Sequence, residues 1–288
     1  METSSPMLPK VTVVTVTYNA ADCVEMTLKS VIAQTYSNLE YIVVDGKSTD
    51  STMDIVERYR AHISTIVSEP DKGIYDAMNK ATRLASGEWI IFMNAGDVFD
   101  NPGVLRNVFN GEIKENSCLI FGAITQYSTL LGVKHVSPAR IASTEHSPFP
   151  YREIMPCFHQ ATFYRTEILK QHPYRSEEFK IAADWASMAD ILDLQLPFTV
   201  VDELIAWYQA GGISSHLTFS HLHERELIRG ASFAWKVKAK MVLQYRLRKL
   251  IIRLIPKKIS TAIRKQYFMD KLGFIELTDE DIKLHLQS

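Results

Sequence analysis

The stretch that decides the fold is Ser68–Asp97, which reads SEPDKGIYDAMNKATRLASGEWIIFMNAGD. Pro and Gly in residues 69–73 predict a turn. The apolar residues of 74–85 recur at three- and four-residue steps, which predicts an amphipathic helix. Residues 89–93 are apolar without alternation, as in a strand buried on both faces of a parallel sheet. Asp97 follows that strand, so we expect its carboxylate at the edge where open α/β sheets bind ligands.

The chain around this stretch predicts more strands of the same sheet. Predicted strands begin at residues 11, 39, 63 and 89, with helices expected between them. Spacings of this length are typical of βαβ units, whose strands are parallel. We therefore expect an α/β fold in which the first hundred residues form a doubly wound unit.

Several classes of protein are disfavoured by composition and by missing motifs. The 288 residues are 46% hydrophobic and 23% charged, typical of a globular chain. Its three cysteines lack metal-ligand spacing, which favours a reduced, cytoplasmic setting. We find no signal peptide and no apolar run of about 18–20 residues that could cross a bilayer. Neither a dinucleotide-binding G-x-G-x-x-G nor a P-loop motif is present.

Polar residues stand where the predicted strands end. Thr15, Thr17 and Tyr18 close the first strand, Asp45 closes the second and Asp97 the fourth. A carboxylate offers only hydrogen-bond acceptors, so a ligand that binds it must supply donors. For Asp45 the alternative is a simple Asp-Gly turn with the next residue.

Several longer sequence motifs carry a family resemblance. They are Glu69–Lys80, Asn94–Asp97, Met155–Tyr164 and Trp207–Ser215. From about Val11 to Ser214 the chain resembles the family 2 glycosyltransferases with the GT-A fold, and among them the bacterial polysaccharide branch that includes the colanic acid enzymes. The resemblance implies a doubly wound, mostly parallel sheet flanked by helices. It divides the chain into a nucleotide-sugar-binding half, an acceptor-binding half and a C-terminal basic helical extension, at residues 1–101, 102–215 and 216–288.

Asp97 is the metal ligand that the resemblance implies, with Mg²⁺ or Mn²⁺ as the cation. Mg²⁺ typically takes one or two carboxylates plus substrate phosphate oxygens, and it stabilises a leaving diphosphate as a Lewis acid. The family motif often has an additional Asp upstream, whereas Ala95 and Gly96 precede Asp97 here. The alternative is a loop Asp that begins a turn.

The resemblance also implies a pocket for a nucleotide-diphosphate sugar, with a UDP-sugar favoured over a GDP-sugar. The residues expected to bind this donor are Thr15, Thr17, Tyr18, Asp45, Asp71, Asn79, Gly211 and Gly212. Gly-rich turns bind phosphate through backbone N–H groups. His159 and Gln160 are expected in the sugar or acceptor pocket, although a His beside aromatic residues is often structural.

Asp184 is the candidate general base. It opens a predicted helix, where a carboxylate is also a good N-cap. An acceptor hydroxyl must lose a proton as it attacks the anomeric carbon, and a positioned carboxylate contributes about 10²–10⁴-fold to such a step. The family places its proposed base at a matching Asp. Base and cap are compatible roles.

The C-terminal part has a different charge from the rest. Residues 225–271 contain 14 Lys or Arg and 2 Asp or Glu, although the whole chain has a net charge of −1. Residues 236–265 alternate basic side chains with a Leu and Ile stripe, which is typical of a helix at a membrane surface. The alternative is a helix that packs on protein, including a second copy of this chain.

We therefore expect an inverting glycosyltransferase that acts on a saccharide or lipid-linked saccharide in surface polysaccharide synthesis. Its location would be cytoplasmic, with peripheral contact to the inner membrane through residues 236–265. The alternative function is a non-catalytic sugar-nucleotide-binding or scaffold protein docked at the membrane. Nucleic acid is not expected as a partner, because Trp235 and Tyr245 are too few aromatic residues to stack bases among the basic ones.

Overall fold

The structure is a computed structural model. It describes residues 8–143, 149–210, 219–230, 242–243, 246, 265–266, 269–270 and 275–285. Its strands are β1 (Val11–Thr17), β2 (Leu39–Asp45), β3 (Thr65–Ser68), β4 (Trp89–Phe92), β5 (Val98–Phe99), β6 (Leu119–Ser128), β7 (Val133–Ser137), β8 (Thr162–Arg165), β9 (Phe198–Gln209) and β10 (Ile275–Glu276). Its α-helices are α1 (Val24–Ile32), α2 (Thr52–Arg58), α3 (Ile74–Leu84), α4 (Val104–Asn110), α5 (Thr166–Gln171), α6 (Ala183–Leu192), α7 (Phe219–Ile228) and α10 (Asp279–His285).

The described strands form one continuous sheet in the order β10-β7-β6-β8-β4-β1-β2-β3, with β9 pairing with both β5 and β6. The neighbours β3, β2, β1 and β4 are parallel, as the spacing of the sequence predicts. Beyond β4 the pairing is mixed, because β8 runs antiparallel to both β4 and β6. The predicted α/β sheet is therefore confirmed: its N-terminal strands are all parallel, whereas the later strands combine antiparallel pairs with the parallel pair of β6 and β9.

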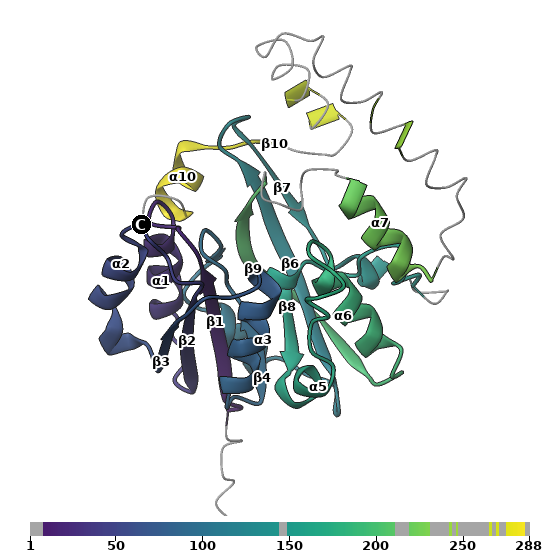
Figure 1. The fold of residues 1–288 in the computed structure, drawn as a ribbon, viewed down its shortest axis with the longest axis horizontal. Helices are drawn as coiled ribbons and strands as arrows, with labels where there is room; N and C mark the ends of the chain where they lie inside the picture. The colour runs from purple at the N-terminus through teal and green to yellow at the C-terminus, as the bar shows by residue number, and fades with distance from the viewer. Residues whose placement is uncertain are drawn as a thin grey trace, which may run out of the picture.

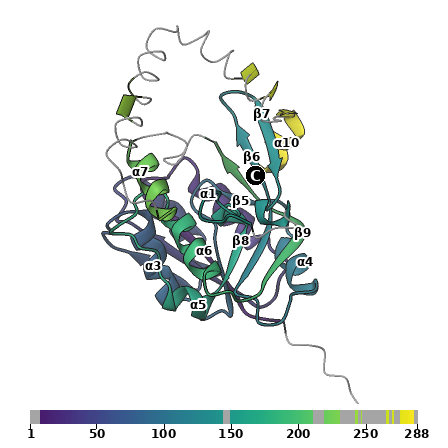
Figure 2. The ribbon, with the colours of Figure 1, turned by 90° about the vertical axis from the view of Figure 1, so that its right-hand side faces the viewer.

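Helices cover both faces of this sheet. Figure 1 shows the parallel strands with α1 and α2 on one side and α3 in front of them. Figure 2, turned by 90°, shows α3, α5, α6 and α7 together on one face and α4 on the other. Between the layers lie buried aromatic side chains, such as Phe109 and Phe163, whose rings meet edge to face at 5.3 Å.

The predicted helix and strand of the deciding stretch are confirmed as α3 and β4. Strand β9 is long, with twelve residues up to Gln209. Two charged residues, Asp202 and Glu203, interrupt its apolar pattern and conceal its length. The strand nevertheless continues because it pairs with β6 on one side, across register shifts, and with β5 on the other.

Parts of the region beyond residue 216 pack on this sheet. β10 adds to β7, and Leu277 packs against Val98, Tyr127 and Trp207. The side chains of Lys134 and Asp281 form an ion pair. Most of the predicted basic helix, residues 236–265, lies outside the described residues. Among the described helices, none is both long and apolar enough to cross a membrane.

Gly87, between α3 and β4, provides a test of this close packing. A Cβ at this position would lie 2.6 Å from Thr12 Oγ1, 2.7 Å from Thr12 N and 2.9 Å from Lys10 O. Since two of these atoms are backbone atoms of the start of β1, relief requires the strands to move apart. We expect Gly87→Ala to lower the free energy of unfolding by about 1–3 kcal/mol, measured by urea denaturation.

Gly111→Ala is the matched control, because a Cβ there would meet backbone oxygens at 3.3 and 3.4 Å. Its effect is expected to be the smaller of the two. Equal stability of the two variants would contradict the close approach of Gly87 to β1.

Candidate active site at the carboxyl edge of the sheet

Parallel pairing brings the ends of three strands side by side. Thr17 at the end of β1 pairs with Asp45 at the end of β2, which in turn pairs with Ser68 at the end of β3. Asp45 is fully buried and accepts hydrogen bonds from Ser48 N at 2.9 Å and Ser68 Oγ at 2.6 Å. Its carboxylate thus holds the turn after β2 through hydrogen bonds. This is the turn role that the sequence offered as the alternative to ligand binding.

Tyr18, Gly46 and Asp71 meet at this edge from three different loops. A Cβ on Gly46 would lie 2.5 Å from Asp71 Oδ2 and 3.3 Å from Tyr18 Cδ2. The Tyr18 side chain is 62% exposed, although the residues before it are buried. An exposed aromatic ring next to a carboxylate is suited to hold a nucleoside by stacking and by hydrogen bonds to its donors. The structure therefore brings together three of the loops expected to bind the donor.

Two of the predicted donor residues are engaged in the scaffold. Thr15 Oγ1 donates to Met93 O at 2.8 Å and lies 2.9 Å from the Tyr41 hydroxyl. The Asn79 side chain donates to Tyr174 O and accepts from Tyr174 N, at 2.8 and 3.0 Å. By contrast, the buried Thr17 Oγ1 has no hydrogen-bond partner. Gly211 and Gly212 lie outside the described residues.

Asp97 lies in the loop after β4, which Thr27 holds by donating from its hydroxyl to Asp97 O at 2.8 Å. Burial raises the pKa of the Asp97 carboxyl to about 6, against the opposing effects of His159 and a hydrogen bond from Gln160. Gly96 has a φ of 98°, a backbone conformation that residues other than glycine rarely adopt. The backbone itself therefore disfavours an Asp at position 96.

The residues around Asp97 fit a divalent cation shared with a substrate. Asp97 is a buried carboxylate with little compensating charge, and the neighbouring Asn94 Oδ1 is buried without a hydrogen-bond partner. Within the part of the chain that the structure describes, no cluster of three or more His, Cys, Asp or Glu could hold a metal ion alone. The chain would therefore supply one or two oxygen ligands and leave other positions to phosphate oxygens, as is common for Mg²⁺.

Asp184 lies in the first turn of α6 but does not cap it. No side chain caps the start of this helix, where Ala182 is the N-cap residue. The Asp184 carboxylate instead contacts the Tyr75 hydroxyl at 3.0 Å and His159 Nδ1 at 3.2 Å. Burial and the adjacent Asp184 raise the pKa of Tyr75 well above its ordinary value, so its hydroxyl stays protonated and donates.

His159 connects Asp184 with the loop of Asp97. Its Nε2 lies 3.0 Å from Asn94 Nδ2 on that loop, while Nδ1 faces Asp184. An amide N–H that donates to Nε2 leaves the ring proton on Nδ1, which then donates to the carboxylate. The next residue, Gln160, hydrogen-bonds to Asp97. His159 and Gln160 therefore stand between the two predicted catalytic groups.

The topology explains why these residues meet. Because β8 is antiparallel to β4, the short 3-10 turn His159–Ala161 before β8 lies where β4 ends. Tyr75 belongs to α3, which covers one face of the sheet. The sequence alone did not suggest roles for Tyr75 or Asn94, although both lie in motifs that carry the family resemblance. Their side-chain contacts cross 109 and 65 residues of sequence, which no local pattern reports.

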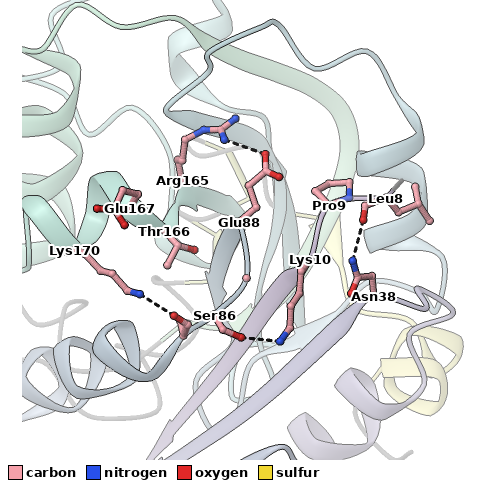
Figure 3. A pocket seen from close by; sticks show the side chains of 12 residues that line it. Leu8, Pro9, Lys10, Asn38, Ser86, Glu88, Arg165, Thr166, Glu167 and Lys170 are labelled. Atoms are coloured by element: carbon pink, nitrogen blue, oxygen red, sulfur yellow. Dashed lines mark hydrogen bonds and ion pairs between the residues drawn. The ribbon is translucent and has the colours of Figure 1, made fainter. Parts of the chain in front are cut away.

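A cavity of about 550 Å³ lies elsewhere, at the start of β1 and β4. Figure 3 shows Lys10 paired with Ser86, and Arg165 paired with Glu88. It is lined by residues from the amino ends of the parallel strands, opposite to the edge that bears Asp97. We therefore assign the candidate active site to the carboxyl edge.

Comparison with known proteins identifies the family of the chain. The family described as glycosyl transferase family 2 matches residues 12–172, more than half of the chain. The chain belongs to glycosyl transferase family 2. It is therefore a glycosyltransferase, as the sequence predicts. The matched segment includes Asp97 and His159 but ends before Asp184, whose place in the site comes from the structure.

Relatives and solved structures extend the likeness. A PGL/p-HBAD biosynthesis glycosyltransferase of Mycobacterium bovis is 28% identical over 262 residues, covering 88% of this chain and 94% of the relative. S. aureus TarS 1-349 in complex with UDP-GlcNAc has a TM-score of 0.61 and 20% identity, covering 89% of this chain and 79% of TarS. The mannosyltransferase PcManGT from Pyrobaculum calidifontis, in complex with GDP-Man and Mn²⁺, has a TM-score of 0.57 and 19% identity, covering 76% and 64%. These structures confirm the predicted GT-A fold.

The raised pKa of Asp97 predicts a pH dependence of stability in the metal-free protein. A carboxyl whose pKa is about 6 when folded, against an ordinary value of 3.8, favours folding when it is protonated. This contribution is complete at low pH and is lost as the pH rises from 3.8 through about 6. Between about pH 5 and about pH 7.5, in EDTA, we expect wild type to lose about 1 kcal/mol relative to Asp97→Asn.

Urea denaturation at the two pH values measures this difference. Asp54→Asn, which removes an exposed carboxylate from α2, is the control and should follow wild type. An Asp97→Asn variant whose stability changes with pH as wild type does would contradict the assignment of a buried, uncompensated charge.

Proposed function

We propose that this glycosyltransferase moves a sugar from a nucleotide-diphosphate donor to a hydroxyl of its acceptor with inversion at the anomeric carbon. Asp184 serves as the general base and Asp97 holds a divalent cation, Mg²⁺ or Mn²⁺. The observation behind this proposal is the arrangement of both carboxylates around His159 at one edge of the sheet. The base and the leaving-group site are thus neighbours, as a single displacement requires.

The donor's nucleoside would lie on the surface formed by Tyr18, Gly46 and Asp71. Thr17 Oγ1, buried without a partner, offers a hydrogen bond close by, and Asp45 would act by shaping the loop after β2. We favour a UDP-sugar over a GDP-sugar. TarS in complex with UDP-GlcNAc supports this choice, while PcManGT in complex with GDP-Man has the same fold with the other nucleotide.

The bound cation would supply Lewis-acid stabilisation of the leaving diphosphate, with Asp97 as its protein ligand. Asp184 would accept the proton of the acceptor hydroxyl while that oxygen bonds to the anomeric carbon and the bond to the diphosphate breaks. The Tyr75 hydroxyl contacts one oxygen of Asp184, and His159 donates to the other. Both contacts fix the orientation of the carboxylate and leave its remaining lone pairs for the acceptor.

The acceptor in this proposal is a saccharide or a lipid-linked saccharide of a surface polysaccharide or glycolipid. The PGL/p-HBAD biosynthesis enzyme is one relative whose name supports it. A closer relation to the colanic acid enzymes stays a prediction from the sequence. Cytoplasmic location, self-association and contact of residues 236–265 with the membrane likewise stay predictions.

Two substitutions test the assignment of roles. We expect Asp184→Asn to lower kcat for transfer by about 10²–10⁴-fold with unchanged affinity for the donor nucleotide, because the donor does not depend on the base. Asp97→Asn should abolish transfer and weaken metal-dependent nucleotide binding. Calorimetry with UDP and GDP, with and without Mn²⁺, and a coupled assay for released nucleotide would measure both effects.

Asp190→Asn is the control, because Asp190 lies on the same helix and pairs with Arg152 and Arg175 away from the site. Full transfer activity of Asp184→Asn would disprove the mechanism. Nucleotide binding without transfer or donor hydrolysis in wild type, over a panel of acceptors, would favour the alternative of a non-catalytic sugar-nucleotide-binding protein.

The basic stripe of residues 236–265 makes a separate prediction about membranes. Each basic residue near an anionic lipid surface contributes on the order of 1 kcal/mol. We expect binding to vesicles that contain anionic lipid, and its loss when Arg248, Lys249 and Arg253 are replaced by Gln. Flotation with neutral vesicles is the control, and equal binding to both kinds of vesicle would argue against an electrostatic contact.

A further inference from the structure

The helix that bears Asp184 begins without a cap of its own. α6 starts at Ala183, and its N-cap residue, Ala182, has no side chain able to accept a hydrogen bond. The backbone N–H groups of Lys180, Ile181 and Ala182 directly precede the helix. The Ala182 N–H is buried and those of Lys180 and Ile181 are partly buried, so leaving them unpaired would cost free energy and an acceptor is needed.

Glu224 on α7 supplies that acceptor. Its Oε1 accepts from Lys180 N at 3.0 Å, and its Oε2 accepts from Ile181 N at 2.9 Å and Ala182 N at 2.8 Å. The residue is only 3% exposed. A buried carboxylate is costly unless several donors compensate it, and hydrogen bonds to a charged acceptor are stronger than neutral ones. Glu224 therefore fixes three consecutive peptide groups.

The fixed segment is connected to the proposed base. The Tyr75 hydroxyl lies 2.7 Å from Ile181 O and 3.0 Å from Asp184 Oδ1. The N–H of Ile181 thus donates to Glu224, while its C=O and the Asp184 carboxylate share the single O–H proton of Tyr75. A shift of this segment would move Tyr75 away from Asp184 and change the start of α6 at the same time.

From these contacts we propose that Glu224 is a positioning residue for Asp184. It anchors the segment 180–182 to α7, and this anchor sets the geometry of Asp184 and Tyr75. The inference rests on the proposed role of Asp184 as general base. It assigns a part in catalysis to α7, which lies beyond the segment matched by the family.

The experiment compares Glu224→Ala and Glu224→Gln with Glu226→Gln, a control on the same helix whose partner is Arg229. Gln keeps the length of the side chain and one acceptor oxygen, so it should rescue part of the function. We expect kcat for transfer to fall about 10–100-fold in Glu224→Ala and less in Glu224→Gln, since misplacement by about 1 Å has effects of this size. Affinity for UDP should stay within about two-fold of wild type in every variant.

These measurements are made per folded molecule, with circular dichroism and thermal unfolding to establish the folded fraction. A purely structural Glu224 would lower the melting temperature but leave kcat of the folded enzyme and its pH profile unchanged. Wild-type kcat in folded Glu224→Ala or Glu224→Gln would therefore overturn the proposal.

A double-mutant cycle keeps the proposal testable if Glu224→Ala does not fold. Tyr75→Phe removes the hydroxyl that contacts both Ile181 and Asp184. If Glu224 acts through this segment, Glu224→Gln should reduce kcat less in the Tyr75→Phe background than in wild type. Independent effects that multiply would overturn the proposal.

The Asp184→Asn variant distinguishes failure of the proposed function from failure of the positioning role of Glu224. If that variant keeps full activity, the proposed function itself fails. If it is inactive while the Glu224 variants have wild-type kcat, only the positioning role fails.

Discussion

The parallel pairing of β2, β1 and β4 is the constraint on which the rest of the structure depends. It aligns the strand ends, so that the loops after them open at one edge of the sheet. β8 then adds antiparallel to β4 and brings the turn at His159 to the same edge. Residues that are distant in sequence become neighbours because strand direction alone decides at which edge each loop emerges. The loops that carry Tyr18, Asp97 and His159 are neighbours because of this alignment.

Within that frame the site consists largely of acidic and neutral groups. Asp97 is buried and its pKa is raised, so its negative charge is poorly compensated by the surrounding protein. Asp184 is held differently, by contacts with the Tyr75 hydroxyl and with His159 Nδ1. Two carboxylates at one edge thus have distinct surroundings, one suited to a metal ion and the other to a proton. Differences in local surroundings, rather than residue type, assign separate roles to equivalent side chains.

The catalytic edge also depends on parts of the chain outside the matched family segment. Asp184 on α6 and Glu224 on α7 lie beyond residue 172, where that segment ends. Strand β10 and Leu277 return to the sheet next to Tyr127 and Trp207. The C-terminal region is thus tied to the GT-A domain at two places. The sheet edge proposed as the active site is therefore built from residues of the N-terminal half and of the region beyond residue 172.

The sequence by itself determined the parallel half of the fold, because β-branched and apolar runs at βαβ spacing specify local structure through backbone preference and burial. It also located Asp97 and Asp184, since strand and helix ends are local features. Only the tertiary structure decided which polar residues serve the scaffold. Thr15, Asn79 and Asp45 make hydrogen bonds within the protein that hold neighbouring segments together. The tertiary structure likewise revealed β9 in full, whose charged residues conceal a strand that pairing with β5 and β6 maintains. The contacts of Glu224 and Tyr75 could not be predicted from the sequence. A hydrogen bond between groups many residues apart leaves no periodic pattern and no motif in the sequence. It exists only once the helices have packed.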